Sequence, residues 1–210
     1  MKTFYKLLLK LALRFSNFLY KLISYLSIKY EGGTHPKHRL LQYHKFFLEN
    51  IKENDSVLDI GCGNGELAFD ISKKANRVLA VDIDPKKISV AQKKYIGQNI
   101  TYKIADATKD LGTEKFDVVI LSNVLEHIEN RIEFLNSIMP LATTFLIRVP
   151  MLSRDWIPLY KKELGIEWRL DLTHFTEFTK ESFYKETGNA GYKIDSFSVQ
   201  FGEIWAVVRP

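Results

Sequence analysis

One stretch constrains the fold more than any other, residues 56–67, which read Ser-Val-Leu-Asp-Ile-Gly-Cys-Gly-Asn-Gly-Glu-Leu. Its short apolar run, bounded by turn residues, predicts a buried strand. Leu67, Ala68 and Ile71 continue with the spacing of a helix. Glycines let the backbone approach a ligand, and the N-terminus of a helix offers unpaired N–H groups. Strand, glycine turn and helix together therefore predict a nucleotide-binding corner.

The spacing of the glycines distinguishes between ligands. A dinucleotide fold requires G-x-G-x-x-G, with the helix dipole directed at a pyrophosphate. Here Gly61, Gly63 and Gly65 give G-x-G-x-G, and Asp59 stands two residues before the first of them. A carboxylate at this place repels a pyrophosphate and attracts a cation. The turn thus argues against a nicotinamide-dependent oxidoreductase and favours a ligand that carries an ammonium and a sulfonium group.

These residues resemble the corresponding motif of the class I S-adenosylmethionine-dependent methyltransferases, and the similarity extends from about Pro36 to the C-terminus. The resemblance implies an α/β fold that is doubly wound, with a largely parallel, seven-stranded, Rossmann-like sheet. It also implies S-adenosyl-L-methionine as the cofactor. Residues 36–210 would form the methyltransferase domain, and residues 1–35 a basic, amphipathic helical extension. Within the family, the chain is similar to the type 11 and ubiquinone-pathway-like enzymes.

The extension carries the basic charge of the chain. Residues 1–45 hold nine Lys and Arg and one acidic residue, whereas the remaining 165 residues hold 21 basic and 24 acidic residues. Residues 3–29 contain no proline or glycine, which predicts one helix. Four basic residues recur on one side of it, and leucines and phenylalanines occupy the opposite side. The basic residues are Lys2, Lys6, Lys10 and Arg14, and the apolar ones are Leu8, Leu11, Phe15, Phe18, Leu19, Leu22 and Leu26.

Two interpretations of residues 1–29 stay open. The helix either lies on an anionic membrane surface or packs on the domain or a second subunit, and the oligomeric state is not predicted. It lacks a stretch of about 18 uncharged apolar residues, so we do not expect it to span a membrane. No cleavage site follows it, so a signal peptide is not expected. Cys62 is the single cysteine, which fits a reducing compartment. We therefore predict a cytoplasmic protein, with peripheral attachment to the inner face of the membrane as an open alternative.

Acidic residues end the next predicted strands. The strand at residues 77–82 ends in Asp82, 21 residues after Gly61. A carboxylate at this distance can accept hydrogen bonds from ribose hydroxyls. Asp84 is the predicted N-cap of the following helix, with Pro85 at its first position.

After a third strand at residues 100–105, the resemblance implies that Asp106 contacts the adenine amino group and that Ala107 lies by the ring. The simplest interpretation of Cys62 is a small buried residue. The predicted cofactor-binding set is Asp59, Gly61, Cys62, Gly63, Gly65, Asp82, Ile83, Asp106, Ala107 and Asn123.

The other predicted elements complete the fold. Residues 36–51 predict a helix that covers the cofactor pocket, and residues 150–179 an irregular, aromatic segment that covers the substrate. Asn130 and Glu133 predict a capping box, and Thr179 caps a last helix. Strands are expected at residues 116–122 and 143–149, followed by a terminal hairpin of residues 192–200 and 203–209.

Two histidines are candidates for the chemistry. Methyl transfer from a sulfonium is an in-line displacement, so the protein mainly aligns the reactants and excludes water. A base is needed where the acceptor proton is hard to remove, as in a sugar hydroxyl. His127 is the first candidate, because the end of the fourth strand faces the transferable methyl in this fold. His174, in the aromatic segment, is the second.

Glu126 and His127 also resemble the E-x-x-E-H metal site of ubiquinone-pathway O-methyltransferases and of small-RNA 2′-O-methyltransferases. Asn123 stands where those enzymes have their first glutamate. An asparagine can offer an oxygen to Mg²⁺, but the lost charge weakens binding. We therefore favour a site without a metal, and binding of a divalent ion at Asn123, Glu126 and His127 stays an open alternative.

The prediction for function is methyl transfer from S-adenosylmethionine to a hydroxyl of a small or lipid-linked metabolite of the envelope-glycan or quinone type. The segment at residues 171–179 resembles a loop of methyltransferases associated with bacterial glycan and cell-envelope biosynthesis. An RNA methyltransferase is the first alternative. No nucleic acid is expected, because the chain after residue 45 is net acidic and lacks a basic patch with interleaved aromatics. A non-catalytic cofactor-binding module is the other alternative.

Overall fold

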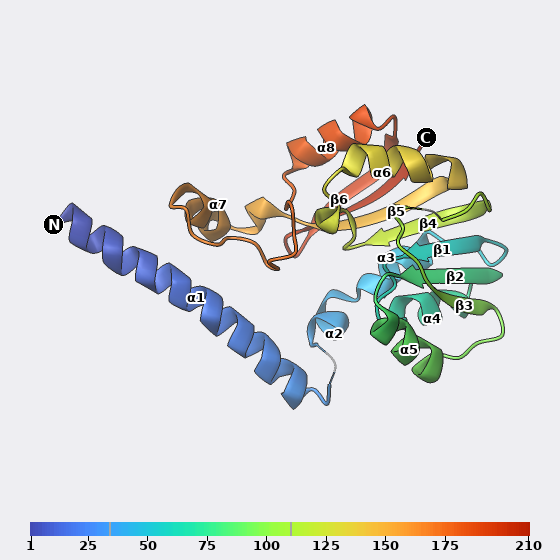
Figure 1. The fold of residues 1–210 in the computed structure, drawn as a ribbon, viewed down its shortest axis with the longest axis horizontal. Helices are drawn as coiled ribbons and strands as arrows, with labels where there is room; N and C mark the ends of the chain where they lie inside the picture. The colour runs from blue at the N-terminus through green and yellow to red at the C-terminus, as the bar shows by residue number, and fades with distance from the viewer. Residues whose placement is uncertain (34, 110) are drawn as a thin grey trace.

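The computed structural model describes residues 1–33, 35–109 and 111–210. A seven-stranded sheet in the order β3-β2-β1-β4-β5-β7-β6 forms its centre (Figure 1). The strands β1 to β5 pair in parallel, and β7 pairs antiparallel with both β5 and β6. The predicted doubly wound fold is therefore confirmed. The strands are β1 (Ser56–Ile60), β2 (Arg77–Asp82), β3 (Ile100–Ile104), β4 (Phe116–Ser122), β5 (Ala142–Pro150), β6 (Lys193–Gln200) and β7 (Glu203–Arg209).

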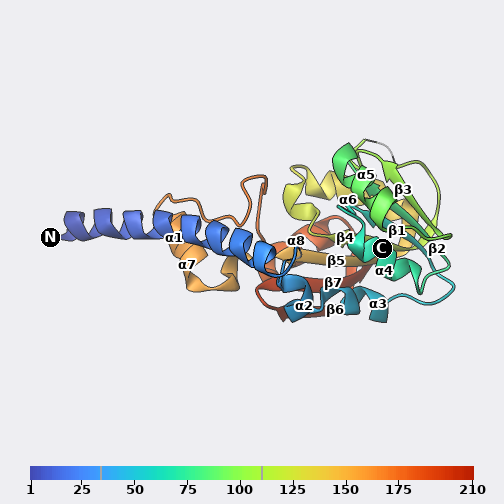
Figure 2. The ribbon, with the colours of Figure 1, turned by 90° about the horizontal axis from the view of Figure 1, so that it is seen from below.

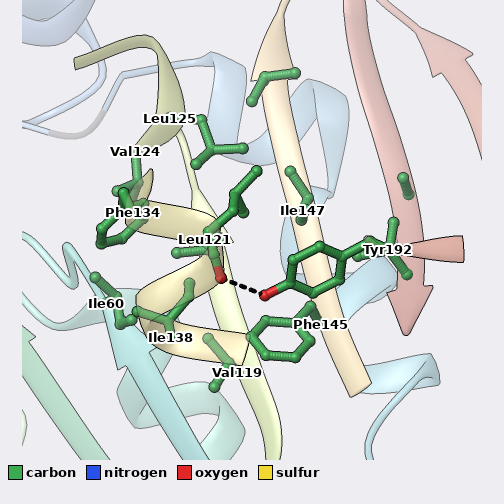
Figure 3. Close-up of a cluster of buried hydrophobic side chains, with 14 of the residues drawn as sticks. Ile60, Val119, Leu121, Val124, Leu125, Phe134, Ile138, Phe145, Ile147 and Tyr192 are labelled. Atoms are coloured by element: carbon green, nitrogen blue, oxygen red, sulfur yellow. Dashed lines mark hydrogen bonds between the residues drawn. The ribbon is translucent and has the colours of Figure 1, made fainter. Parts of the chain in front are cut away.

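Two apolar cores lie on the two faces of the sheet. One contains Leu121 and Phe145 (Figure 3) and is covered by α6 (Arg131–Ile138) and α8 (Lys180–Asn189) (Figure 1). In it, the Tyr192 hydroxyl donates a hydrogen bond of 2.9 Å to the Leu135 carbonyl. The other core contains Val57 and Ile120. It is covered by α3 (Tyr43–Glu49), α4 (Glu66–Ser72) and α5 (Pro85–Lys94).

The strand order reverses between β1 and β4. In open α/β sheets, ligands bind outside the carboxyl ends of the strands at such a switch point. The glycine turn follows β1 and leads into α4, so the nucleotide-binding corner predicted from residues 56–67 lies at this point.

Two local predictions were wrong. Residues 36–51 form two helices, α2 (Lys37–Leu41) and α3, because Gln42 between them adopts a left-handed conformation with φ of 45°. Asn130 precedes α6 but makes no side-chain cap in the part of the chain described, so the capping box is absent there. The caps at Asp84 and Thr179 are confirmed. Asp84 accepts from the Lys86 amide, and Thr179 forms a capping box with Ser182.

The helix α1 (Lys2–Tyr30) is continuous, as predicted, and projects from the domain along the short helix α7 (Trp156–Glu163) (Figures 1 and 2). Leu13 is its one buried side chain, and Asn17 donates a hydrogen bond of 2.8 Å to the Glu167 carbonyl. The leucines and phenylalanines of the predicted apolar side do not pack on the domain. Leu8, Leu11, Phe15, Phe18, Leu22 and Leu26 are all exposed. Within the residues described, no helix is sufficiently long and apolar to cross a membrane.

Candidate active site

A cavity of about 360 Å³ lies at the carboxyl ends of β1 and β4. The glycine turn forms one side of it through Asp59, Gly61 and Gly63, and Asn123 forms part of the floor. The segment at residues 35–43 also lines it, through His35, Lys37, His38 and Tyr43. We call this space the donor cavity. The segment before β1 thus stands over the glycine turn, where the sequence analysis placed a lid.

Asp59 is the most unusual group in the donor cavity. Its side chain is 1 % exposed, and its Oδ2 has no hydrogen-bond partner within the described residues. Burial and the neighbouring carboxylate of Asp82 raise the pKa of Asp59 to about 8. A buried carboxylate without a partner is costly, so this oxygen is suited to receive a cationic ligand group.

Asp82 supports the turn from the end of β2. Its Oδ2 accepts a hydrogen bond of 2.9 Å from the Gly63 amide, and its Oδ1 accepts one of 2.9 Å from the Asp84 amide. The side chain is buried, with Lys87 at 4.0 Å. This carboxylate therefore fixes the conformation of the glycine turn, in addition to the role toward ribose predicted for it.

The three glycines of the turn have different structural roles. At Gly63 a side chain would meet no atom within 4 Å, because the position faces the open cavity. At Gly61 a Cβ would lie 2.7 Å from a methyl group of Val124, so the turn packs closely on the loop after β4. Gly65 is not among the residues that line the donor cavity. A Cβ there would lie 2.8 Å from both Ala91 and Tyr102, so this glycine serves helix packing.

The remaining predicted cofactor residues surround this centre. Cys62 lines the cavity, and burial raises the pKa of its thiol. Asn123 adopts φ of 57° directly after β4. Ile83 is exposed after β2, and Ala107 packs at the edge of the core. Asp106 accepts hydrogen bonds from the amide and hydroxyl of Thr108 and pairs with Lys109 at 3.0 Å. Its carboxylate is thus engaged in its own turn.

The structure brings the two candidate histidines together. His127 ends the 3₁₀ helix η1 (Leu125–His127), and its ring lies edge-on to that of His174 with centroids 4.7 Å apart. Thr173 donates its hydroxyl proton to Asp171 at 2.9 Å and lies 3.0 Å from Nδ1 of His127. Because the Thr173 proton is used, Nδ1 of His127 carries the hydrogen of this contact and Nε2 is left unprotonated. Burial and the charge of His174 lower the pKa of His127, which favours the neutral ring.

Glu126 lies beside this pair and is fully buried, and neither of its carboxylate oxygens has a partner in the part of the molecule described. Burial raises its pKa to about 8. Ligand atoms of Glu126, His127 and His174 lie within 4.8 Å of one another, so these residues could hold a metal ion. Asn123, the third ligand considered from the sequence, lines the donor cavity.

The sequence analysis missed a buried ion pair beside the donor cavity. Arg148 on β5 and Glu203 on β7 form two hydrogen bonds of 2.7 and 2.8 Å. The guanidinium lies over the ring of Tyr43 at 4.3 Å and over that of Trp205 at 5.0 Å. The pair ties the segment over the cavity to the sheet. The partners are far apart in the sequence, so no local pattern indicates them.

Comparisons with known proteins agree with this geometry. Residues 58–141 match the family described as "Methyltransferase domain". Ribosomal protein L11 methyltransferase from Burkholderia lata is 39% identical over 101 residues, which make up 45% of this chain and 32% of that protein. The chain thus spans about a third of the length of the curated relatives it matches.

Solved structures share the fold at low identity. Magnesium protoporphyrin IX methyltransferase from Synechocystis PCC 6803, with bound S-adenosylhomocysteine, has a TM-score of 0.65 and 20% identity, covering 82% of either chain. The N-methyltransferase NodS from Bradyrhizobium japonicum WM9, with the same ligand, has a TM-score of 0.60 and 13% identity. It covers 82% of this chain and 86% of the other.

The strand order and the glycine turn after β1 define a class I methyltransferase fold. The match to the family model then identifies residues 58–141 as a methyltransferase domain. The predicted family and cofactor are thereby confirmed.

Proposed function

We propose that this protein transfers the methyl group of S-adenosylmethionine to a hydroxyl of a lipid-linked metabolite at an anionic membrane surface. The observation that carries the methyl-transfer part is the unpartnered carboxylate of Asp59 in a glycine-lined cavity. S-adenosylmethionine carries an ammonium and a sulfonium group, and a carboxylate without its own counter-ion is the matching site. A dinucleotide would instead bring a pyrophosphate to this carboxylate.

The donor-binding roles follow from this arrangement. Asp59 would hold the ammonium group, and the backbone at Gly63 leaves the space that the donor occupies. Asp82 would accept hydrogen bonds from the ribose while it holds the turn. When bound, the donor supplies a methyl group on a positively charged sulfur. The sulfur leaves as a neutral thioether, so its departure needs no acid.

The base would be His127. A neutral ring with Nε2 free can take the proton of an acceptor hydroxyl, and the chain from Asp171 through Thr173 fixes the ring. His174 supports it edge-on and is held by Glu177 at 3.1 Å. His127→Ala should lower turnover without changing donor affinity, whereas a collapse of donor affinity would assign His127 to the donor pocket.

The membrane part is supported by α1. The helix has no acidic residue, six Lys and Arg, and a continuous exposed apolar side. Basic amphipathic helices of this kind bind anionic lipid surfaces. Attachment through α1 would bring the cavity close to acceptors that reside in the bilayer.

The test is to incubate the protein with radiolabelled donor and separate lipid, polar-metabolite, protein and RNA fractions of its host. Label in the lipid fraction, lost with His127→Ala, is the expected result. A protein acceptor is the second candidate, because the curated relatives are named as ribosomal protein methyltransferases. Label in the protein or RNA fraction would overturn the proposed acceptor, and no label in any fraction would favour a non-catalytic module.

A further inference from the structure

A second cavity, of about 390 Å³, lies between α1, α7 and the turn that joins β6 to β7. Lys37 lines both this space and the donor cavity. Glu203 lines the second cavity, whereas its ion-pair partner Arg148 lines the first. The two spaces are therefore neighbours, separated by one ion pair and one lysine. We call the second space the α1 cavity.

The helix α1 is a built wall of this cavity. Ser16, Asn17, Tyr20 and Lys21 line it from α1. His35 connects the end of α1 to α2, because its Nδ1 accepts from the Lys37 amide at 3.1 Å and its Nε2 lies 3.1 Å from the hydroxyl of Ser24. The position of α1 over the cavity is thus fixed by polar contacts along its length.

The carboxylates that line the α1 cavity all have partners. Glu203 is paired with Arg148, and Glu167 with Arg169 at 2.7 Å. Asp155 caps α7 by accepting from the Ile157 amide. Two of the three are thus neutralised by an arginine, and the third, Asp155, attracts Lys161 less than Arg154 repels it.

Three lysines of the same cavity lack a carboxylate partner in the described ranges, namely Lys21, Lys37 and Lys161. Lys161 is 9 % exposed, and its Nζ donates to the side-chain oxygen of Asn17 at 2.6 Å. Burial, together with the charge of Arg154, lowers the pKa of Lys161. A buried ammonium is normally paired with a negative charge, and here its one side-chain contact is a neutral amide.

We propose that the α1 cavity binds a phosphate group of the methyl acceptor, held by Lys21, Lys37 and Lys161. A phosphate supplies the negative charge that these side chains lack, and it would anchor the acceptor beside the donor cavity at Lys37. The rings of Tyr20 and Trp168 line the same space and offer apolar surface next to the phosphate. The acceptor role rests on the proposed function, but the phosphate site itself does not.

Binding of n-octyl phosphate, below its micelle concentration, tests the site by calorimetry with the full-length protein. Octyl glucoside is the uncharged control, and inorganic phosphate is the water-soluble probe. We expect octyl phosphate to bind and octyl glucoside to bind at least tenfold more weakly. Lys21→Gln and Lys161→Met should each weaken octyl phosphate binding about tenfold. Lys10→Gln, on the same helix but outside the cavity, should leave it unchanged.

The outcomes distinguish a lipid phosphate from a soluble phosphate ester, and the phosphate site from the proposed function. Tighter binding of octyl phosphate than of inorganic phosphate assigns the site to a lipid phosphate, and equal binding assigns it to a soluble phosphate ester. No binding of either probe, or binding that Lys21→Gln and Lys161→Met leave unchanged, overturns the site. Lys21→Gln remains decisive if Lys161→Met fails to fold. Phosphate binding without methyl transfer would refute the proposed function alone, whereas methyl transfer with an unchanged acceptor KM in Lys21→Gln would refute the assignment of this site to the acceptor and leave the proposed function intact.

Discussion

At the scale of single residues, the ionisation of Asp59 should make donor affinity depend on pH. Its pKa of about 8 in the free protein means that the carboxyl is mostly protonated at pH 6. A cationic donor favours the ionised form, so binding should release a proton below pH 8. Donor affinity should therefore rise by up to about tenfold per pH unit from pH 6 toward pH 8. Above about pH 8 it should fall again, since an α-amino group loses its proton there.

Asp59→Asn is the matched variant for this prediction. It should weaken the binding of S-adenosylhomocysteine and abolish the rise in affinity between pH 6 and 8, both measured by calorimetric titration. The folded pKa is raised, so the contribution of Asp59 to stability is present at low pH and is lost as the pH rises through 8. The free variant should therefore unfold at higher temperature than wild type at pH 8. A wild-type affinity that does not depend on pH would contradict the assignment.

Gly63 and Gly65 should respond to the same substitution in opposite ways. Gly65→Ala forces a Cβ to within 2.8 Å of Tyr102 at φ of 87°, so we expect a loss of about 2–4 kcal/mol in unfolding free energy. Gly63→Ala meets no protein atom, so its loss should stay near 1 kcal/mol. Its methyl group should instead lower donor affinity about tenfold, because it occupies the cavity. Urea unfolding and donor titration of both variants separate the two effects.

The residues that sequence reasoning could find are those whose role is set locally. Asp59 and the glycine turn lie within seven residues and carry their chemistry in their spacing. Lys161 and Asn17 are 144 residues apart, and Arg148 and Glu203 are 55 apart. No periodicity links such partners, because folding alone brings them together. Gly65 shows the converse case, in which a motif position serves packing and does not line the cavity.

At the scale of elements, strands were easier to predict than helix junctions. Parallel strands such as β4 are buried on both faces and form continuous apolar runs, so their bounds can be read from the sequence. The division of residues 36–51 into α2 and α3 depends on the left-handed Gln42. That conformation lets α3 bury Phe47 against the sheet while α2 faces the donor cavity. Tertiary packing sets this bend, and no glycine or proline next to Gln42 indicates it in the sequence.

The stability of the protein should depend strongly on the buried ion pair between β5 and β7. Glu203→Gln leaves the buried guanidinium of Arg148 without its counter-charge, and removing one partner of such a pair costs about 3–5 kcal/mol. The double variant Arg148→Met with Glu203→Leu removes both charges and should lose much less. Urea unfolding of Arg148→Met, Glu203→Leu and the double variant measures the coupling. Losses that simply add in the double variant would show that the pair does not act as a unit.

At the scale of the whole molecule, α1 has two separate surfaces. One, through Leu13, Asn17 and Lys21, faces the domain and completes the α1 cavity. The other, which includes Leu11 and Phe15, stays exposed. Removing the helix would therefore abolish the proposed membrane contact and the cavity wall at once. Point substitutions on the exposed surface are needed to separate the two.

The last prediction concerns this exposed surface. Wild type should co-sediment with vesicles that contain phosphatidylglycerol, less with neutral vesicles and less in high salt, since each basic residue near an anionic surface contributes about 1 kcal/mol. Leu11→Asp combined with Phe15→Asp should abolish sedimentation, because both side chains are more than half exposed and their loss removes apolar burial in the lipid. Ile96→Asp, at a still more exposed apolar position just after α5, is the control and should sediment as wild type does.

Octyl phosphate and donor binding should survive in the Leu11→Asp, Phe15→Asp variant, since neither residue lines a cavity described above. The rival for the exposed surface is a second copy of the chain. Sedimentation velocity without lipid distinguishes membrane binding from association of two chains. A helix that binds a membrane predicts a monomer for both the wild type and the double variant. A wild-type dimer that the two substitutions convert to a monomer, with no binding to anionic vesicles, would show that α1 joins subunits. The helix would then complete the α1 cavity within an oligomer, and the membrane argument would be lost.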